Sequence, residues 1–377
     1  MKIRSVVAAL GVAAALLGAQ PAPAQSTPDL SQQDSHAEFW PDPSHGAQLR
    51  LIGQATLPPG LIFQGTTVGS LSGLDWSPFT GRWYAISDDR STDGGPSRFY
   101  TLAIDYDAQA VRGIRVTNVT LLRDRQGKTF GPGAVDPESI RRSPLLGLLY
   151  WSSEGDISEG IDPSVNIAAP GGRLLHSFDL PQRFRASRDG KTGPRDNQVF
   201  EGLTFSPGGR TVWVSTENSL IQDVAPSPTP GPDPVRIIGF DTLTGRAAAE
   251  YVYLTDAPVD GAKFGVTEIL SGFGNRLLVL ERTFIPGVGN KVRLYLADWK
   301  GATNVSRLDS LVGARWRPMT KTLLLDFNAL PGVRIDNLEA MSWGPRLSNG
   351  NRSLVVMSDD NFNATQITQA LVFELRR

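Results

Sequence analysis

The sequence has no cysteine, which excludes disulfide bonds, a thiol nucleophile and a cysteine-based zinc site. Histidine is also scarce. The three histidines are His36, His45 and His176, and they supply neither a serine–histidine–aspartate set nor a histidine-rich metal site well. No G-x-S-x-G elbow, phosphate-binding loop or dinucleotide-binding glycine motif occurs. What remains is carboxylate-assisted or metal-assisted chemistry.

An excess of charge of one sign is missing as well. The chain has 37 Lys and Arg residues against 38 Asp and Glu residues, a net charge of −1, whereas a nucleic-acid binder shows a clear basic excess. We therefore expect no nucleic-acid partner. Beyond the N-terminal region, no apolar run approaches 18 residues, so no membrane-spanning helix is predicted.

The N-terminal region has the pattern of a secretory signal peptide. Lys2 and Arg4 precede the apolar run VVAALGVAAALLGA, and Ala22-Pro23-Ala24 follows it. We predict that residues 1–24 are a signal peptide cleaved after Ala24, that residues 25–47 are flexible, and that the product is periplasmic or secreted. An uncleaved membrane anchor is the alternative, although the apolar run is short for one.

Glycine and proline are plentiful, with 39 and 27 residues, and such frequent turn formers indicate many short strands. Five segments repeat one pattern of apolar strand, turn, second apolar strand and acidic residue. They begin at Ser72, Pro137, Phe200, Val266 and Asn337. Further strand-like segments follow each hairpin, so each repeat predicts four antiparallel strands.

These repeats predict an all-β fold, a single β-propeller over residues 48–377 with five blades. The segment Gln48–Pro58 is expected to supply the outer strand of the last blade, because joining the first strand to the last removes free sheet edges. Six blades are the second interpretation, and a pair of β-sandwiches is a third.

Aligning the five hairpins places acidic residues in two columns. The column at the start of the first strand comprises Ser72, Glu138, Glu201, Glu268 and Glu339. The column at the end of the second strand comprises Asp89, Glu154, Glu217, Glu281 and Asp360. Both positions lie at the same end of an antiparallel hairpin. The alignment therefore predicts nine carboxylates around one mouth of the central channel.

Nine like charges at close range need a cation or bound protons, so all nine carboxylates are predicted metal ligands. Ca²⁺ is favoured over Mg²⁺ because it accepts six to eight oxygen ligands. The predicted catalytic residues are Glu201, Glu217 and Glu339. The alternative is structural: each carboxylate accepts hydrogen bonds from backbone amides and joins neighbouring blades.

Basic side chains also lie close to these acids in the sequence. Those predicted to bind an anionic substrate are Arg90, Arg141, Arg282 and Lys263. Arginine suits this role because its guanidinium holds phosphate through two parallel hydrogen bonds. Simple pairing with neighbouring acids is the alternative.

Several motifs occur in an order that resembles the phytase-like esterase family. They are SGL, SDDR, NQVFEGLTFSPGGRTVWVSTEN, VTEI with LLVLER, and NLEAM followed by SDDNFNATQ and LVFEL. The resemblance covers about Leu51 to Phe373. It implies a β-propeller hydrolase that depends on Ca²⁺ and uses a water nucleophile. The catalytic residues of true phytases are not matched in this chain.

The sequence thus favours an exported, metal-dependent ester hydrolase acting on a small, anionic ester. We expect a monomer without a membrane span. Two alternatives remain: a non-catalytic binding or scaffold propeller, in which the acids only stiffen the ring, and a lactonase-like hydrolase.

Overall fold

The computed structural model describes residues 48–144, 146–227, 231–272 and 274–376. The predicted signal peptide, the predicted flexible segment, His36 and His45 lie outside these residues. The described residues form five four-stranded antiparallel sheets and one small hairpin of β2 (Ile62–Phe63) and β3 (Thr66–Thr67). The prediction of an all-β propeller with five blades is therefore confirmed.

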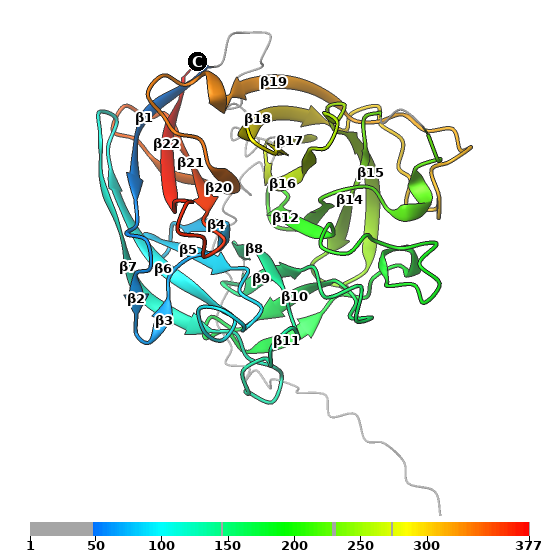
Figure 1. The fold of residues 1–377 in the computed structure, drawn as a ribbon, viewed down its shortest axis with the longest axis horizontal. Helices are drawn as coiled ribbons and strands as arrows, with labels where there is room; N and C mark the ends of the chain where they lie inside the picture. Colours follow the sequence, from blue (N-terminus) through cyan, green and yellow to red (C-terminus); the bar gives the residue numbers. More distant parts are fainter. Residues whose placement is uncertain (1–47, 145, 228–230, 273, 377) are drawn as a thin grey trace, which may run out of the picture. The chain divides into compact units, whose positions relative to one another are not determined.

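Each of the first four blades is built from four consecutive strands (Figure 1). Blade 1 contains β4 (Leu71–Ser77), β5 (Arg82–Ser87), β6 (Arg98–Tyr106) and β7 (Val111–Leu121). Blade 2 contains β8 (Pro137–Arg142), β9 (Leu149–Ser153), β10 (Ser164–Ala168) and β11 (Leu174–Ser177). Blade 3 contains β12 (Phe200–Phe205), β13 (Thr211–Thr216), β14 (Pro234–Asp241) and β15 (Ala247–Leu254). Blade 4 contains β16 (Lys263–Ser271), β17 (Arg276–Ile285), β18 (Gly289–Asp298) and β19 (Thr320–Asp326).

Blade 5 combines strands from both ends of the described chain. Its first three strands are β20 (Asn337–Arg346), β21 (Arg352–Asp359) and β22 (Gln369–Arg376), and β1 (Gln48–Thr56) is its outer strand. The pairing of β1 with β22 runs from Gln48 opposite Arg376 to Thr56 opposite Gln369. None of the helices in the described part of the chain is long and apolar enough to cross a membrane.

The first strand of each blade lies nearest the centre of the ring (Figure 1). Residues of these inner strands such as Leu74, Ile140 and Leu203 are completely buried. Each inner strand also contains a β-bulge near its start, where the register with the second strand shifts. A bulge adds one unpaired residue and redirects its side chain, so it determines which side chains reach the end of the channel.

Glycines beside two of these bulges allow neighbouring blades to approach closely. A Cβ atom on Gly202 of β12 would lie 2.4 Å from the backbone nitrogen of Ile269 in blade 4. On Gly73 of β4, it would lie 2.6 Å from the carbonyl oxygen of Glu138 in blade 2. The inner strands therefore have no room for a side chain at these two positions.

We predict that Gly202→Ala lowers the free energy of unfolding by about 1–3 kcal/mol, because the added methyl group overpacks the contact between blades. Gly113→Ala in β7 is the control, since a Cβ atom there has no neighbour within 4 Å. Denaturant unfolding of both variants tests the prediction. Equal stability of the two variants would contradict it.

Candidate functional site

The strand register defines equivalent positions in the five blades. The last pair before each bulge joins Leu71 to Ser87, Pro137 to Ser153, Phe200 to Thr216, Val266 to Glu281, and Leu338 to Ser358. The next residue along the first strand is, in turn, Ser72, Glu138, Glu201, Thr267 and Glu339. The next residue along the second strand is, in turn, Asp88, Glu154, Glu217, Arg282 and Asp359. We call these positions the mouth ring.

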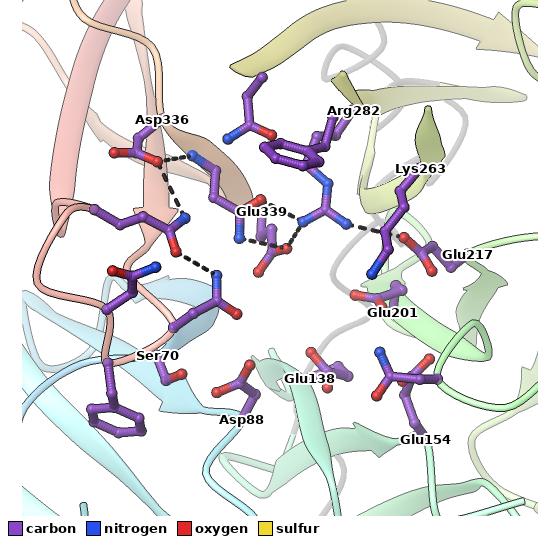
Figure 2. Close-up of a pocket in the computed structure, with 18 of the residues that line it drawn as sticks. Ser70, Asp88, Glu138, Glu154, Glu201, Glu217, Lys263, Arg282, Asp336 and Glu339 are labelled. Atoms are coloured by element: carbon purple, nitrogen blue, oxygen red, sulfur yellow. Dashed lines mark hydrogen bonds and ion pairs between the residues drawn. The ribbon is translucent and has the colours of Figure 1, made fainter. Parts of the chain in front are cut away.

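Most of the mouth ring surrounds one cavity of about 1050 Å³ at the end of the channel. Its acidic lining includes Asp88, Asp136, Glu138, Glu154, Glu201, Glu217 and Glu339. Figure 2 shows the carboxylates of Asp88, Glu138 and Glu201 directed toward the same open space. Blades 1, 2, 3 and 5 therefore bring acidic side chains to a single cavity.

Three carboxylates lie close enough together to share one cation. Asp136, Glu138 and Glu154 are buried, and each offers an oxygen atom within 4.8 Å of those of the other two. Glu138 and Glu154 are mouth-ring residues of blade 2, and Asp136 directly precedes β8. One Glu154 oxygen also accepts a hydrogen bond from the backbone amide of Val199.

Burial and mutual repulsion raise the pKa values of these acids. Burial, followed by the charge of Glu201, places the pKa of Glu138 well above its usual value. Burial, followed by the charge of Glu154, does the same for Glu201. The side chains of Glu138 and Glu201 accept no hydrogen bond from any residue that the structure describes. The expectation that backbone amides satisfy each carboxylate therefore fails at both positions.

The fourth blade contributes a cation to the mouth ring, because Arg282 occupies the position that is acidic in the other four blades. Its guanidinium lies 3.1 Å from a Glu217 oxygen and also donates to Glu339 and Asn337. These interactions appear as dashed lines in Figure 2. Arg282 thus pairs with two acids of the ring. These pairs compete with the predicted binding of a substrate anion by Arg282.

The other predicted substrate-binding cations have different surroundings. Lys263 is exposed and lines the cavity. Arg90 also lines it, 2.6 Å from Asp156 and 3.6 Å from Asp136. Arg141 is buried below the mouth, where its guanidinium pairs with Glu268 at 2.7 Å. Arg141 therefore does not line the mouth cavity, whereas Lys263, Arg90 and Arg282 do.

At two positions of the mouth ring, the predicted metal ligand is the residue after the one that occupies the ring. Asp89 is fully buried against Arg98 at 2.8 Å and accepts hydrogen bonds from the backbone amides of Thr92, Asp93 and Gly94. These donors lower the pKa of Asp89 even though its burial would raise it. Asp360 likewise accepts from the Ser70 amide at 2.8 Å and the Thr368 hydroxyl at 2.8 Å. The oxygens of both carboxylates are therefore engaged by loop residues.

Two further predicted ligands, Glu268 and Glu281, also point elsewhere. Glu268 lies one residue beyond the bulge and accepts from the Leu203 amide at 3.1 Å, in addition to its pair with Arg141. Glu281 is the residue before the mouth-ring position, so it points to the other face of β17. There it binds Lys321 at 2.7 Å and accepts from the Tyr253 hydroxyl.

The sequence pattern did not single out Asp88, Asp136 and Asp359, nor three further acids that line the cavity, Asp93, Asp196 and Asp336. Asp88 and Asp359 are the first members of two Asp-Asp pairs, in SDDR and SDDN. The sequence pattern predicts the second member of each pair as the metal ligand. Burial is the main reason that the pKa values of Asp88 and Asp359 are well above the usual value. The pairs were visible in the sequence, but the bulge that selects one member was not.

The fold and the site together define a β-propeller with an acidic cavity at one end of its channel. Residues 66–362 match the family described as phytase-like, with the esterase-like activity of phytase. The chain belongs to this family, and the family description supports a hydrolase. No curated protein is similar enough in sequence to count as a relative.

Solved structures with a similar fold share little sequence with this chain. A thermostable family-43 glycoside hydrolase is 8% identical, with a TM-score of 0.47 over 86% of this chain and 93% of that chain. The Pseudomonas aeruginosa periplasmic gluconolactonase PpgL is 14% identical, with a TM-score of 0.35 over 82% and 88%. A bifunctional GH43-CE protein of Bacteroides eggerthii is 10% identical, with a TM-score of 0.44. The match covers 84% of this chain but only 34% of the Bacteroides protein.

Raised carboxyl pKa values predict that the metal-free protein loses stability as pH rises. The pKa values of Asp136 and Glu217 are both raised to about 7, chiefly by burial. The folded chain therefore holds more protons than the unfolded chain above about pH 4. We expect the free energy of unfolding, measured with denaturant in chelator, to fall from about pH 5 to 8. Glu217→Gln should flatten this fall, and a stability that rises over the range would contradict the prediction.

Removing the positive charge of Arg282 from the mouth ring should strongly destabilise the fold. Arg282→Met leaves Glu217 and Glu339 buried without their partner, so we expect a loss of about 3–5 kcal/mol at neutral pH. The loss should shrink toward about pH 5, because Glu217, whose pKa is raised to about 7, then binds a proton. Arg276→Met is the control, because its 3.3 Å pair with Asp298 is more exposed and should contribute under about 1 kcal/mol. Equal losses in the two variants, measured by denaturant unfolding, would refute this prediction.

Proposed function

We propose that this protein is an exported ester hydrolase that acts in the mouth cavity with a bound divalent cation, Ca²⁺ in preference to Mg²⁺. The observation that carries the proposal is the group of Asp136, Glu138 and Glu154, whose oxygens lie within 4.8 Å of one another. Ca²⁺ binds oxygen at about 2.3–2.6 Å, so two ligands on opposite sides of one ion are about 4.8 Å apart. The family description supports ester chemistry.

The donor set fits a hard cation. The candidate ligands are carboxylates, which Ca²⁺ prefers, and Glu138 is 93% buried without a hydrogen-bond donor among the described residues. A cation would remove the repulsion that raises the pKa values of these acids. When bound, it would supply Lewis acidity toward an ester oxygen.

Glu201 is the best-placed residue to accept a proton from the attacking water. It lines the cavity beside the proposed metal ligands, and no described residue donates to its carboxylate. A general base must lie within reach of the proton that it accepts, and Glu201 faces the open space of the cavity. Glu217 and Glu339, the other predicted catalytic residues, are held by Arg282. We assign them a positioning role.

The cavity lining suggests a small ester with a polar and an apolar part. Lys263 and Arg90 at the cavity wall would orient an anionic group. Phe284 and Val288 also line the cavity, and they are 41% and 65% exposed, so they offer an apolar surface to the rest of the molecule. We propose that the chain acts as a monomer in the periplasm or outside the cell, after export directed by residues 1–24.

The proposal predicts Ca²⁺-dependent turnover by the purified protein. A panel of phosphomonoesters, phosphodiesters, carboxylic esters and a lactone should include at least one substrate, and chelator should abolish its hydrolysis. Glu138→Gln should weaken Ca²⁺ binding by about 100-fold in calorimetry, since it removes a charged ligand. Glu201→Gln should lower kcat by about 10²–10⁴-fold while Ca²⁺ binding persists.

Glu281→Gln is the matched control, because Glu281 was aligned with the ring acids but lies outside the cavity lining. It should leave both turnover and Ca²⁺ affinity unchanged. Absence of turnover on every ester would overturn the hydrolase proposal. Turnover that is unchanged by chelator would refute the proposed role of the divalent cation.

A further inference from the structure

The sheet of blade 4 extends further beyond the mouth ring than those of blades 1, 2 and 3. In those three blades, the first strand begins at the last pair before its bulge, at Leu71, Pro137 and Phe200. In blade 4, β16 begins at Lys263, three residues before the corresponding Val266. β17 and β18 continue beside it, and their pairing ends with Ile285 opposite Gly289. We call residues 263–265 and 282–292 the blade 4 wall.

One face of the blade 4 wall lines the mouth cavity. Lys263 is the cross-strand partner of Phe284, and Gly265 is the partner of Arg282. Direct partners share a face of a sheet, and so do residues two apart along a strand. Since Arg282 belongs to the mouth ring, Lys263 and Phe284 lie on the face that bears it, and both line the cavity. A cation and an aromatic ring are therefore neighbours on the cavity wall.

The blade 4 wall presents apolar side chains to the cavity. Phe284 is 41% exposed, and Val288, in the turn between β17 and β18, is 65% exposed. Both line the cavity. The Val288 amide donates to the Ile285 carbonyl oxygen at 3.0 Å, which closes the turn. An aromatic ligand gains more from Phe284 than an aliphatic one, because two rings attract each other beyond the burial of their surfaces.

Lys263 differs from the other cations of the cavity lining in its lack of an acidic partner. Arg90, Arg282 and Arg334 also line the cavity, and each of them pairs with an acid. The Lys263 ammonium forms no ion pair or hydrogen bond within the described part of the chain. Figure 2 shows its side chain directed into the space beside Glu201. Lys263 is thus available to an anionic group of a ligand.

We propose that the substrate of the mouth cavity is an ester whose aromatic ring carries an anionic group, and that the blade 4 wall binds this ring. The ring packs against Phe284 and Val288, and its anionic group pairs with Lys263. Phe284 and Lys263 are direct cross-strand neighbours, so a ring with a charged substituent reaches both. The substrate class rests on the proposed hydrolase function, whereas binding to the wall does not require turnover.

Three probes test binding to the blade 4 wall. 2-Naphthoate has the ring and the anion, decahydro-2-naphthoate lacks the aromaticity, and 2-naphthylmethanol lacks the charge. In calorimetric titrations of the purified protein with Ca²⁺ present, 2-naphthoate should bind about threefold or more tightly than either analogue. The proposal is overturned if 2-naphthoate shows no saturable binding up to about 10 mM, or if either analogue binds equally well.

Variants of the blade 4 wall locate the binding site. Phe284→Ser should weaken 2-naphthoate binding by about threefold or more. Lys263→Met should abolish the preference for 2-naphthoate over 2-naphthylmethanol, because it removes the charge that recognises the anion. Both side chains are exposed, so we expect both variants to fold, and thermal unfolding verifies this. Unchanged binding in either folded variant would refute the assignment.

Each variant has a matched control outside the cavity lining. Phe79→Ser removes a phenylalanine that is 73% exposed, and Lys291→Met removes an exposed lysine of β18. Both controls should bind 2-naphthoate as the unaltered protein does. Losses equal to those of Phe284→Ser and Lys263→Met would show that the binding lies elsewhere.

Kinetics distinguish this inference from the proposed hydrolase function. For a hydrolysed ester with a carboxylate on its aromatic ring, Phe284→Ser should raise KM by about threefold or more with kcat unchanged, as expected for a lost binding contact. An unchanged KM would refute the substrate class and leave the hydrolase proposal intact. If 2-naphthoate binds as expected but no ester is hydrolysed, the hydrolase proposal and the ester fail together, and the wall stands as a binding site for aromatic anions.

Discussion

Repulsion among buried carboxylates at the channel mouth is the constraint around which the site is organised. Blades 1, 2, 3 and 5 place an acid at the mouth-ring position of the second strand, and blade 4 places Arg282 there. Arg282 neutralises Glu217 and Glu339 on its own side. Asp136, Glu138 and Glu154 do not pair with Arg282, and each offers an oxygen atom within 4.8 Å of those of the other two. The cation beside them is Arg90, which lies 3.6 Å from Asp136. Arg282 thus offsets the negative charge of two ring acids, and the rest of the acidic lining stays crowded with like charges.

The surrounding fold keeps these acids in place with interactions that do not face the cavity. Asp89 holds its loop through Arg98 and three backbone amides. Glu268 and Arg141 join inner strands across the channel. Gly202 lets blades 3 and 4 pack without a side chain between them. Buried pairs of this kind are costly to break on one side only, so they hold the backbone that aims the mouth ring, and the mouth acids cannot separate to relieve their repulsion.

The two ends of the channel differ in charge because different residues occupy the start and the end of each inner strand. Acids such as Glu138 and Glu201 occupy the start of the strands. Tryptophan and arginine residues lie at the far end, where Trp343 and Arg346 occur near the end of β20. Arg141 lies between these environments. One ring of strands therefore carries two surfaces of different chemistry, an acidic one at the mouth and an aromatic one at the far end.

The sequence by itself determined the repeat, the all-β class, the five blades and the acids Glu138, Glu154, Glu201, Glu217 and Glu339 near one end of the inner strands, because turn residues and alternating apolar residues are local signals. Only the tertiary structure decided between Asp88 and Asp89, or between Asp359 and Asp360. A bulge shifts the register by one residue, and a shift of one residue moves a side chain to the other face of the strand. Pairing of Arg141 with Glu268 was equally invisible, since it joins blades 2 and 4, whose strands meet only once the ring has closed.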